Sequence, residues 1–391
     1  MRVCVVSELY PRHRDPVLGI WAHEQARAAV AAGVEVRVLV LHRPVPPRAS
    51  LASARAALIG LRDVLHQPPR ARLDGIDVGY VPFLAPPRPR SYGSWGAWAA
   101  PPLAVALHAL HRRWPFDLVH AHYAVPAGEA VRRAAASRPL VVSVHGGDVL
   151  ATAHQSPAGA QAVRRALGHA RLVLANSADT ARRCTEHGAR ATRVVHLGSD
   201  LPAAPAPAPR TPVLVSVGHL VARKRHADLI RAVARLADRH PALRCEIAGE
   251  GPEHQRLEAL ARELGVADRV ALLGQLAPAA ARARARAASV FVLPSTDEAF
   301  GVAYVEAMAG GVPAIGCRGE GGPEEIAAAG PGLELVTPGD AGALAETLHG
   351  LLVDEPRRRA LGADARATVA HSFTWAACGQ ATATAYADAL S

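Results

Sequence analysis

The chain has 391 residues, of which 50% are hydrophobic and 20% charged, so it is long enough for two domains and too hydrophobic for a disordered protein. Its formal net charge of +10 favours polyanionic partners such as nucleic acid, anionic lipid or phosphate-bearing small molecules. The arginines are scattered, without aromatic-interleaved basic strands or zinc-finger spacing, and this pattern argues against a nucleic-acid partner.

The N-terminal sequence, MRVCVVSELYP, contains one arginine and an apolar run that is too short for a signal peptide. Five cysteines lie far apart with no CxxC pair, which is typical of buried thiols in a reducing cytosol. The longest apolar stretch, residues 95–110, is interrupted by Pro101 and Pro102 and predicts a buried or surface-lying helix rather than a membrane span. We therefore expect a cytoplasmic protein, with peripheral contact on an anionic inner membrane face as an open alternative.

The first half of the chain alternates short β-branched runs with alanine-rich helical segments. A loop through Gly19 and a helix over 21–32 follow the first of these runs. The expected strands of this half are 3–6, 34–41, 118–122, 140–145, 172–176 and 193–197. Short apolar strands separated by helices indicate a parallel sheet that is covered on both faces.

Alternating proline and alanine at residues 201–212 interrupt this rhythm and predict a semi-rigid linker. The rhythm then restarts, with expected strands at 213–218, 243–249, 269–274, 289–294 and 312–317. The basic run at 281–289 is expected to be the solvated face of a helix. We therefore predict an α/β protein with two Rossmann-like, doubly wound domains that face an interdomain cleft. The expected parts are an N-terminal acceptor-side domain (1–200), the linker (201–212), a C-terminal donor-side domain (213–370) and a C-terminal helix (371–391) that packs back on the first domain.

Lys224 is the only lysine among the 44 lysines and arginines. It lies between the strand expected at 213–218 and a helix that begins near Arg225, at a turn where backbone amides and the helix dipole attract anions. The sequence around Lys224 is close to the motif of a phosphate-binding P-loop, G-x4-G-K-[ST]. However, Arg223 and Arg225 stand where that loop needs glycine and Ser/Thr, which excludes an ATPase. On this segment alone, phosphate contact and a solvated lysine both stay open.

Two carboxylates flank the start of a helix in the segment LPSTDEAFGVAYVEAMAGGVP. Glu298 lies in the loop, and Glu306 lies eight residues later in the second turn of a helix expected over 302–309. The amides of Phe300–Val302 can receive an anion, and carboxylates accept hydrogen bonds from the vicinal hydroxyls of a ribose or hexose. This arrangement suits a sugar nucleotide. The alternative is that Asp297 and Glu298 only cap the helix.

The same segment resembles the E-x7-E signature of retaining glycosyltransferases of the family 4 (group 1) kind, which have the GT-B fold. GHLVARKR resembles that family's G-R-L-x-x-x-K-G, and LRCEIAGEGPEHQRLEALARELG resembles its strand-turn-helix block. VVHLGSD is similar to the segment that closes the first domain, SVHGGD to the His-Gly-x-Asp loop, and DLVHAHY to the strand before that loop. The likeness covers most of the chain and is weak over residues 43–115.

The resemblance implies a role for each matched residue. Glu306 would hold the ribose hydroxyls, Glu298 the donor sugar, and Gly19 a phosphate from the first domain. The implied catalytic residues are His145, which would stand over the reacting carbon, Glu298 and Lys224. The implied donor-binding residues are Gly19, Gly218, His219, Arg223, Lys224, Phe300, Gly301, Val302 and Glu306.

The chain departs from the family pattern at His219, where the family usually has arginine. Arg223 and Arg225 stand where an acid and a glycine are common, and either arginine is a candidate to replace the missing guanidinium. Four residues beside the matched motifs are expected to face the cleft and contact the acceptor. They are Trp21, His23, Glu24 and Tyr123.

No metal or other cofactor is expected beyond the nucleotide sugar. His120, His122 and His145 suggest a zinc site, but His120 and His122 alternate on a strand and are expected to face opposite ways. No D-x-D pair occurs in the sequence, so a metal-bridged diphosphate is not indicated.

The expected function is metal-independent transfer of a hexosyl unit, with retained configuration, from a nucleotide diphosphate sugar to a hydroxyl acceptor. The acceptor is a glycan, a lipid-linked group or a small natural product. Rate enhancement would come from orientation and from neutralising the leaving diphosphate, with departure on the front face. Two alternatives stay open. One is a GT-B sugar phosphorylase or nucleotide-sugar epimerase, and the other is a non-enzymatic basic protein that binds polyanions or membranes.

Overall fold

The structure is a computed structural model of the chain and describes residues 1–391 except 14, 46–52, 89 and 208. The chain divides into two compact units. Unit 1 comprises Met1–His196 together with Cys378–Ser391, and unit 2 comprises Leu197–Ala377. Each unit is built around its own parallel-strand-rich sheet.

In unit 1, the described strands form one sheet in the order β3-β4-β2-β1-β5-β6-β7-β8. Their bounds are β1 (Arg2–Ser7), β2 (Glu35–His42), β3 (Arg70–Leu73), β4 (Ile76–Pro82), β5 (Leu118–His122), β6 (Leu140–Val144), β7 (Leu172–Ala175) and β8 (Thr192–Val194). The neighbouring strands are parallel except β3 and β4, which form an antiparallel hairpin. The turn of this hairpin, Asp74–Gly75, has positive φ at both residues, as a tight Asp-Gly turn requires. This hairpin is not among the strands expected from the sequence.

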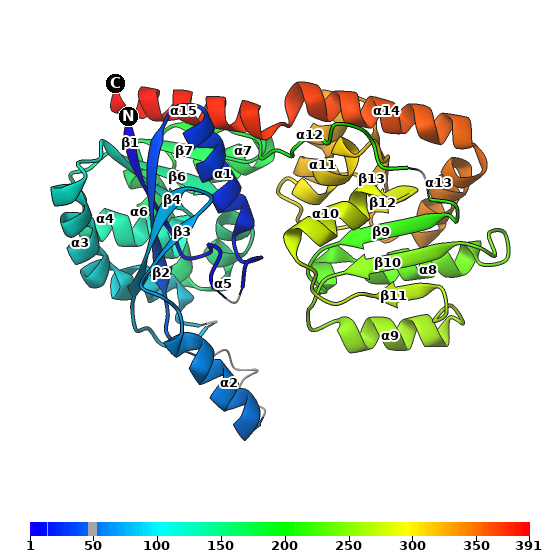
Figure 1. The fold of residues 1–391 in the computed structure, drawn as a ribbon, viewed down its shortest axis with the longest axis horizontal. Coiled ribbons are helices and arrows are strands. Elements are labelled where there is room, and N and C mark those ends of the chain that lie inside the picture. The colour runs from blue at the N-terminus through cyan, green and yellow to red at the C-terminus, as the bar shows by residue number, and fades with distance from the viewer. Residues whose placement is uncertain (14, 46–52, 89, 208) are drawn as a thin grey trace. The chain divides into compact units, whose positions relative to one another are not determined.

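Helices cover both faces of this sheet (Figure 1). Their bounds are α1 (Ile20–Ala31), α2 (Ala54–Leu65), α3 (Trp95–Arg113), α4 (Glu129–Ala134), α5 (Ala153–Gln155), α6 (Pro157–His169), α7 (Ala178–Glu186) and α15 (Trp375–Leu390). The helix expected over 95–110 is present as α3, and Pro101 and Pro102 lie inside it without ending it. One side of α3 is buried through Leu103 and Leu107, while Val105 is exposed.

The C-terminal helix α15 supplies buried side chains to unit 1 from Cys378 onward. Gln25 Nε2 of α1 donates a hydrogen bond of 3.1 Å to Thr382 Oγ1. A Cβ at Gly379 would come within 2.1 Å of the carbonyl oxygen of Ala28, so glycine permits the close approach of the two helices. Figure 1 shows α15 crossing close to one end of α1.

In unit 2, the described strands form a parallel sheet in the order β11-β10-β9-β12-β13-β14. Their bounds are β9 (Val213–Val217), β10 (Arg244–Ala248), β11 (Val270–Leu272), β12 (Val290–Val292), β13 (Ala314–Cys317) and β14 (Leu333–Val336). The sequence predicted all of these except β14. In both units, the central strands follow the doubly wound order of a Rossmann-like fold, which confirms the predicted fold class.

The helical segments of unit 2 alternate with its strands. They are the short 3₁₀ helix η5 (Ala222–Lys224), α8 (His226–Leu236), α9 (His254–Glu263), α10 (Pro278–Arg286), α11 (Val302–Ala309), α12 (Gly321–Ala329), α13 (Ala341–Val353) and α14 (Glu355–Ser372). The basic run forms the helix α10 as expected, but its arginines are paired as well as solvated. Arg284 Nη1 donates to Glu246 at 2.9 Å, and Arg286 Nη2 donates to Ser199 Oγ at 3.0 Å.

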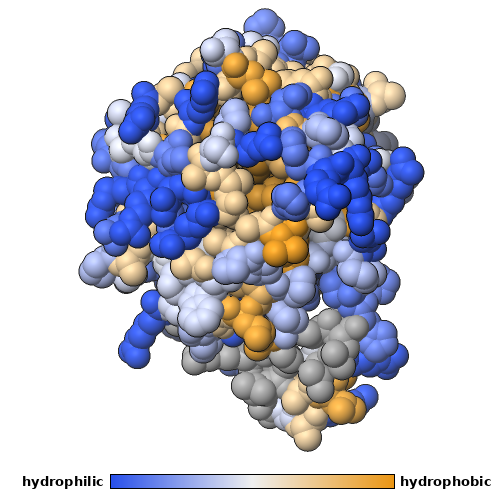
Figure 2. Space-filling model, turned by 90° about the vertical axis from the view of Figure 1, so that its left-hand side faces the viewer, coloured by the Kyte–Doolittle hydropathy of each residue, from blue (hydrophilic) through white to orange (hydrophobic). Residues whose placement is uncertain are grey.

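The surface of unit 1 on its α3 side is mixed, with small hydrophobic patches scattered among hydrophilic residues (Figure 2). Exposed hydrophobic side chains on this unit include Leu58, Trp98 and Val105. Within the described ranges, no helix combines the length and the apolar character that crossing a bilayer requires. All five cysteines are buried and none forms a disulfide, as expected for thiols.

Candidate functional site

The strand order of each sheet reverses beside its first strand, between β1 and β5 in unit 1 and between β9 and β12 in unit 2. In open parallel sheets, ligands bind beyond the carboxyl ends of the strands at this reversal. Here β5 leads into Tyr123, β9 leads into Gly218, and β12 is followed closely by Glu298. Each unit therefore carries predicted site residues where its fold favours a ligand.

Lys224 and Glu298 form an ion pair at this edge of unit 2. Lys224 Nζ is 2.5 Å from Glu298 Oε2, and the side chains are only 11% and 10% exposed. Burial alone raises the pKa of Glu298, but the charge and hydrogen bond of Lys224 hold that pKa below its ordinary value. The carboxylate is therefore ionised, and the structure brings together two of the three predicted catalytic residues.

The loop that carries Glu298 is held in an uncommon backbone conformation. Asp297 has φ 53°, in the left-handed region, and the Thr296 amide donates to the Arg223 carbonyl at 2.8 Å. Ser295 Oγ donates to Glu298 Oε2 at 2.9 Å, and the Glu298 amide donates to Glu320 Oε2 at 3.1 Å. These contacts fix the carboxylate towards Lys224 instead of leaving it as a simple helix cap.

Glycines allow the loop after β9 to approach the turn after β10. A Cβ at Gly249 would come within 1.9 Å of the Gly218 carbonyl oxygen, and one at Gly251 would come within 2.3 Å of the Leu220 oxygen. The Leu220 amide also donates to the Glu250 carbonyl at 2.9 Å. The backbone of the lysine loop is therefore braced by the Gly-Glu-Gly turn, to which the sequence analysis assigned no role.

The helix α11 begins as the sequence predicts, directly after Gly301. Gly301 is left-handed with φ 93°, and no side chain caps the helix. Phe300 is buried beneath this turn, and Gly322 packs so closely that an added Cβ would lie 2.3 Å from Phe300 Cα. Glu306 lies in α11, and its Oε1 is 3.7 Å from Arg282 Nη1. The start of α11, near Val302, thus has the features of an anion-binding helix terminus.

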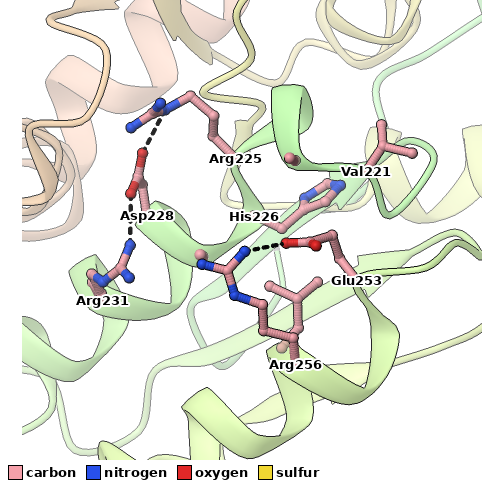
Figure 3. A pocket seen from close by; sticks show the side chains of 10 residues that line it. Val221, Arg225, His226, Asp228, Arg231, Glu253 and Arg256 are labelled. Carbon is pink, nitrogen blue, oxygen red and sulfur yellow. Dashed lines mark hydrogen bonds and ion pairs between the residues drawn. The ribbon is translucent and has the colours of Figure 1, made fainter.

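The two arginines beside Lys224 point to different surroundings. Arg223 Nη1 donates to the Asp297 carbonyl at 3.3 Å, and its charge helps to lower the pKa of Glu298. Arg225 instead donates through Nε to Asp228 Oδ2 at 2.7 Å. Figure 3 shows Arg225 and Arg231 both directed at Asp228, in a pocket of about 220 Å³. Of these two arginines, Arg223 is the one next to the Lys224–Glu298 pair.

Two histidines border the lysine loop. His219, which stands where the resembled family usually has arginine, is exposed. His226, the first residue of α8, is buried beneath the loop, with its Nδ1 3.2 Å from Ser216 Oγ. Burial and the charge of Lys224 lower the pKa of His226 to about 4, so this imidazole is neutral near pH 7.

In unit 1, Gly19 begins α1 in the left-handed conformation with φ 65°. A Cβ there would come within 2.1 Å of the Leu9 carbonyl oxygen, so only glycine fits this turn. The three predicted acceptor residues of α1 have different surroundings. Trp21 is half-buried with its ring centroid 6.2 Å from that of His145, whereas His23 is buried and lies 2.7 Å from Tyr10 Oη. Glu24 forms an ion pair with Arg27 at 2.8 Å, a contact that involves neither Trp21 nor His145.

The expectation that His120 and His122 face opposite ways is wrong. Their ring centroids are 4.4 Å apart, because residues two apart on a strand project from the same face. His120 Nε2 lies 2.8 Å from Ser143 Oγ, and its Nδ1 lies 2.7 Å from Tyr386 Oη. Among the described residues, no group of three or more His, Cys, Asp or Glu side chains is placed to hold a metal ion.

His145 lies directly after β6, and Nε2 of its ring is 3.0 Å from His122 Nδ1. Its centroid is 5.2 Å from that of Tyr123, a residue with a positive φ of 73°. Burial lowers the pKa of His145 to about 3. Nearby, the fully buried Asp148 accepts a hydrogen bond of 3.3 Å from the Val125 amide. Burial raises the pKa of Asp148 to about 7, although this backbone bond opposes the shift.

The structure thus forms two clusters from the predicted residues. One joins Trp21, Tyr123 and His145 in unit 1, and the other joins Arg223, Lys224 and Glu298 in unit 2. Sequence reasoning gave no role to Asp148, Ser295 or Glu320. Asp148 could have been found from the sequence, because it is the last residue of the His-Gly-Gly-Asp motif. Ser295 and Glu320 could not, because only the fold brings them into contact with Glu298.

Comparison with known proteins adds independent findings. The family model described as "Glycosyl transferases group 1" matches residues 200–368, and the model described as "Glycosyltransferase Family 4" matches residues 18–202. A relative named D-inositol 3-phosphate glycosyltransferase, from Nocardia farcinica, is 33% identical over 307 residues, covering 70% of this chain and 67% of the relative. The protein of the same name from Corynebacterium aurimucosum is 36% identical over 187 residues, covering 46% of this chain and only 44% of the relative.

Among solved structures, the sucrose-phosphate synthase of Thermosynechococcus elongatus superposes with a TM-score of 0.80. The two chains are 22% identical, and 99% of each chain is covered. At this identity the likeness concerns the fold, and it supports the two-domain, Rossmann-like GT-B architecture. The family models, the Nocardia relative and the positions of the motifs agree, and this chain belongs to the group 1, family 4 glycosyltransferases.

Proposed function

We propose that this protein is a retaining, metal-independent hexosyltransferase that uses a nucleotide diphosphate sugar as donor and a hydroxyl group as acceptor. The observation that carries the proposal is the buried Lys224–Glu298 pair beside the uncapped start of α11. A cation, a carboxylate and a helix N-terminus at one sheet edge suit a ligand that joins a diphosphate to a polyhydroxyl sugar.

In this proposal, unit 2 binds the donor. Lys224 neutralises the diphosphate as it leaves, and Arg223 supplies the second positive charge. Glu306 accepts hydrogen bonds from the ribose hydroxyls, and Glu298 accepts them from the donor sugar. A fixed cation that meets charge developing on the leaving group typically contributes about 10²–10³-fold to the rate.

Unit 1 contributes His145 in the same proposal, with Trp21 and Tyr123 as the nearest acceptor contacts. Its imidazole is neutral near pH 7, so it acts as a hydrogen-bond donor or acceptor and not as a cation. Retention then proceeds by departure of the diphosphate on the face where the acceptor attacks, and the diphosphate takes the acceptor proton.

The test combines donor binding with product analysis. A panel of UDP and GDP sugars is screened by thermal shift, since a donor present at 100 times its Kd stabilises the folded state by about 2.7 kcal/mol. Proton NMR of the transferred or hydrolysed sugar then gives the anomeric configuration, and a chelator is added to test metal independence. Inverted product or loss of activity with the chelator contradicts the corresponding part of the proposal.

The same experiment separates the alternatives. Phosphate-dependent breakdown of a glycoside would identify a phosphorylase, and donor turnover without any acceptor would identify an epimerase. Salt-sensitive polyanion binding, with no donor stabilisation, would identify a non-enzymatic basic protein.

A further inference from the structure

A second histidine lies behind His145, at the end of β5. His122 Nδ1 is 3.0 Å from His145 Nε2, and the rings are parallel to within 1° with their centroids 5.2 Å apart. This distance and the shared ring orientation fit one N–H···N hydrogen bond. His122 has no exposed surface, so no water competes for the bond.

The pair is supported from β5, β6 and α15. The ring of His120 packs against His122 at 4.4 Å between centroids. His120 is itself held by Ser143 on one nitrogen and by Tyr386 of α15 on the other. On the opposite side, the rings of Trp21 and Tyr123 face His145. His122 therefore cannot turn away without disturbing several buried contacts.

Both imidazoles are neutral near pH 7. Burial lowers the pKa of His145 to about 3, and burial with the neighbouring His120 and His145 places the pKa of His122 well below its ordinary value. A neutral imidazole carries one proton, on one of its two nitrogens. If the shared proton belongs to His122 Nδ1, His145 holds its own proton on Nδ1 and is a donor there. If the proton belongs to His145 Nε2, His145 Nδ1 is an acceptor.

The outer nitrogens favour the first arrangement. His145 Nδ1 and His122 Nε2 are both buried, with no hydrogen-bond partner in the part of the chain that the structure describes. An unpaired N–H is least tolerated where no ligand or water can reach it. Both outer nitrogens are enclosed, but His122 as a whole has no exposed surface whereas His145 as a whole is partly exposed, so the unpaired donor is better placed on His145, the residue nearer the surface.

We propose that His122 is a positioning residue that fixes the ring plane of His145 and keeps the His145 proton on Nδ1, ready to donate to an oxygen of the bound sugar substrate. The inference rests on the proposed function, because the contact between His145 and the substrate belongs to that proposal. It adds a residue and a tautomer that the family resemblance did not supply.

The molecule contains a matched control. His240 Nε2 and His349 Nδ1 lie 2.8 Å apart on the helices α8 and α13, and neither residue belongs to the site. If the His122–His145 hydrogen bond served only packing, removing it should affect kcat no more than removing the His240–His349 hydrogen bond. His349→Phe removes this second bond, so it measures the general cost of losing one.

The experiment compares wild type, His122→Phe, His122→Asn and His349→Phe. Phenylalanine keeps an aromatic ring but cannot hydrogen-bond, whereas the asparagine amide occupies the place of Nδ1. We expect His122→Phe to lower kcat about 10- to 100-fold, the effect of a small misplacement of a reacting group. We expect nucleotide diphosphate affinity, measured by calorimetry, to change by less than about twofold. His122→Asn should recover most of kcat, and His349→Phe should leave it unchanged.

Nitrogen NMR of the imidazole rings gives a readout that does not depend on turnover. Wild type should show His145 protonated on Nδ1, and His122→Phe should show a mixture of the two tautomers. If the His145 signals are the same in both proteins, or if kcat falls equally in the His349 variant, the inference is overturned. If wild type turns over no donor, the proposed function fails, while the His145 tautomer still decides the inference. If His122→Phe does not fold, the His145 tautomer in wild type and in His122→Asn decides it, since both should show the Nδ1 proton.

Discussion

At the carboxyl edge of the sheet in unit 1, the buried histidines are uncharged near pH 7, and at the corresponding edge in unit 2 there is a buried ion pair. Burial lowers the pKa values of His120 and His145 to about 3, and burial raises the pKa of Asp148 to about 7. In unit 2, Lys224 lies 2.5 Å from Glu298 and holds the pKa of that carboxyl below its ordinary value. Unit 1 also has an ion pair after β1, Arg88–Glu8 at 2.6 Å, so the two edges differ in the groups around the predicted site residues and not in the presence of charge.

The difference shows how burial acts with and without a partner of opposite charge. A buried ionisable group neutralises itself unless such a partner repays the lost hydration. Among the described residues, neither His145 nor Asp148 has such a partner, whereas Glu298 has Lys224 at hydrogen-bonding distance. In the proposed function, the charged pair of unit 2 would meet the diphosphate, and the uncharged His145 of unit 1 would meet a sugar hydroxyl.

The largest expected effect comes from breaking the ion pair. We expect Lys224→Ala to lower kcat/KM about 10²–10³-fold, because it removes the cation that, in the proposed function, neutralises the leaving diphosphate. Lys224→Arg should recover only part of the loss, since a planar guanidinium does not replace a compact ammonium end-on. Steady-state kinetics with the identified donor measures both.

The same change leaves Glu298 buried without its partner, so stability needs its own control. Lys224→Ala combined with Glu298→Gln removes both charges and should restore much of the lost stability to urea without restoring turnover. Near-normal kcat/KM in the single alanine variant would show that the lysine has no role in catalysis.

The next effect tests whether the buried Asp148 of unit 1 is uncharged in the folded protein. Asp148 has its ordinary pKa of 3.8 when unfolded and a pKa of about 7 when folded. Folding therefore favours the protonated acid, and this contribution is lost as pH rises from 3.8 through 7. Asparagine cannot ionise, so Asp148→Asn should not lose this stability as pH rises. We expect the difference in free energy of unfolding, variant minus wild type, to increase by about 3 kcal/mol from pH 5 to pH 8.

Urea unfolding at both pH values makes this comparison. The buried histidines oppose the trend, because their lowered pKa values cost stability as pH falls below 6.5. They are present in both proteins, so their contribution cancels in the difference. Parallel pH profiles for the two proteins would mean that Asp148 is ionised in the folded state at neutral pH.

A smaller effect separates the two carboxylates of unit 2. Glu306→Gln should raise KM for the donor about tenfold and weaken nucleotide diphosphate binding, because the ribose changes little on the way to the transition state. Glu298→Gln should mainly lower kcat, because the sugar gains positive charge in the transition state. Calorimetry with the nucleotide diphosphate distinguishes them. Equal losses of nucleotide affinity would contradict this division of roles.

The smallest expected effect concerns Arg223, the arginine proposed to replace the guanidinium that is missing at His219. We expect Arg223→Ala to raise donor KM about two- to fivefold, the modest value typical of an exposed charge. Arg225→Ala should leave KM unchanged and lower stability instead, because Arg225 is paired with the buried Asp228. A KM effect confined to Arg225→Ala would reverse the assignment.

Most of the fold could be predicted from local patterns. Apolar β-branched runs marked the central strands of both sheets, and Gly310, Gly311 and Pro313 marked the end of α11. The hairpin of β3 and β4 was missed although its Asp74–Gly75 turn is a clear signal, and β14 was missed because its four residues carry no distinctive pattern. The orientation of His120 and His122 was mistaken because the period of a strand was applied wrongly.

The sequence by itself determined the alternation of strands and helices, the isolated lysine, the spacing of Glu298 and Glu306, and the glycines that permit left-handed turns. These features depend on residues close together in the chain, where periodicity and turn chemistry act directly. Only the tertiary structure decided that Lys224 reaches Glu298, that Arg225 turns to Asp228, and that His122 bonds to His145. The first and last of these contacts join residues from different strands or loops, and all three depend on register, packing and side-chain direction, which no local pattern encodes.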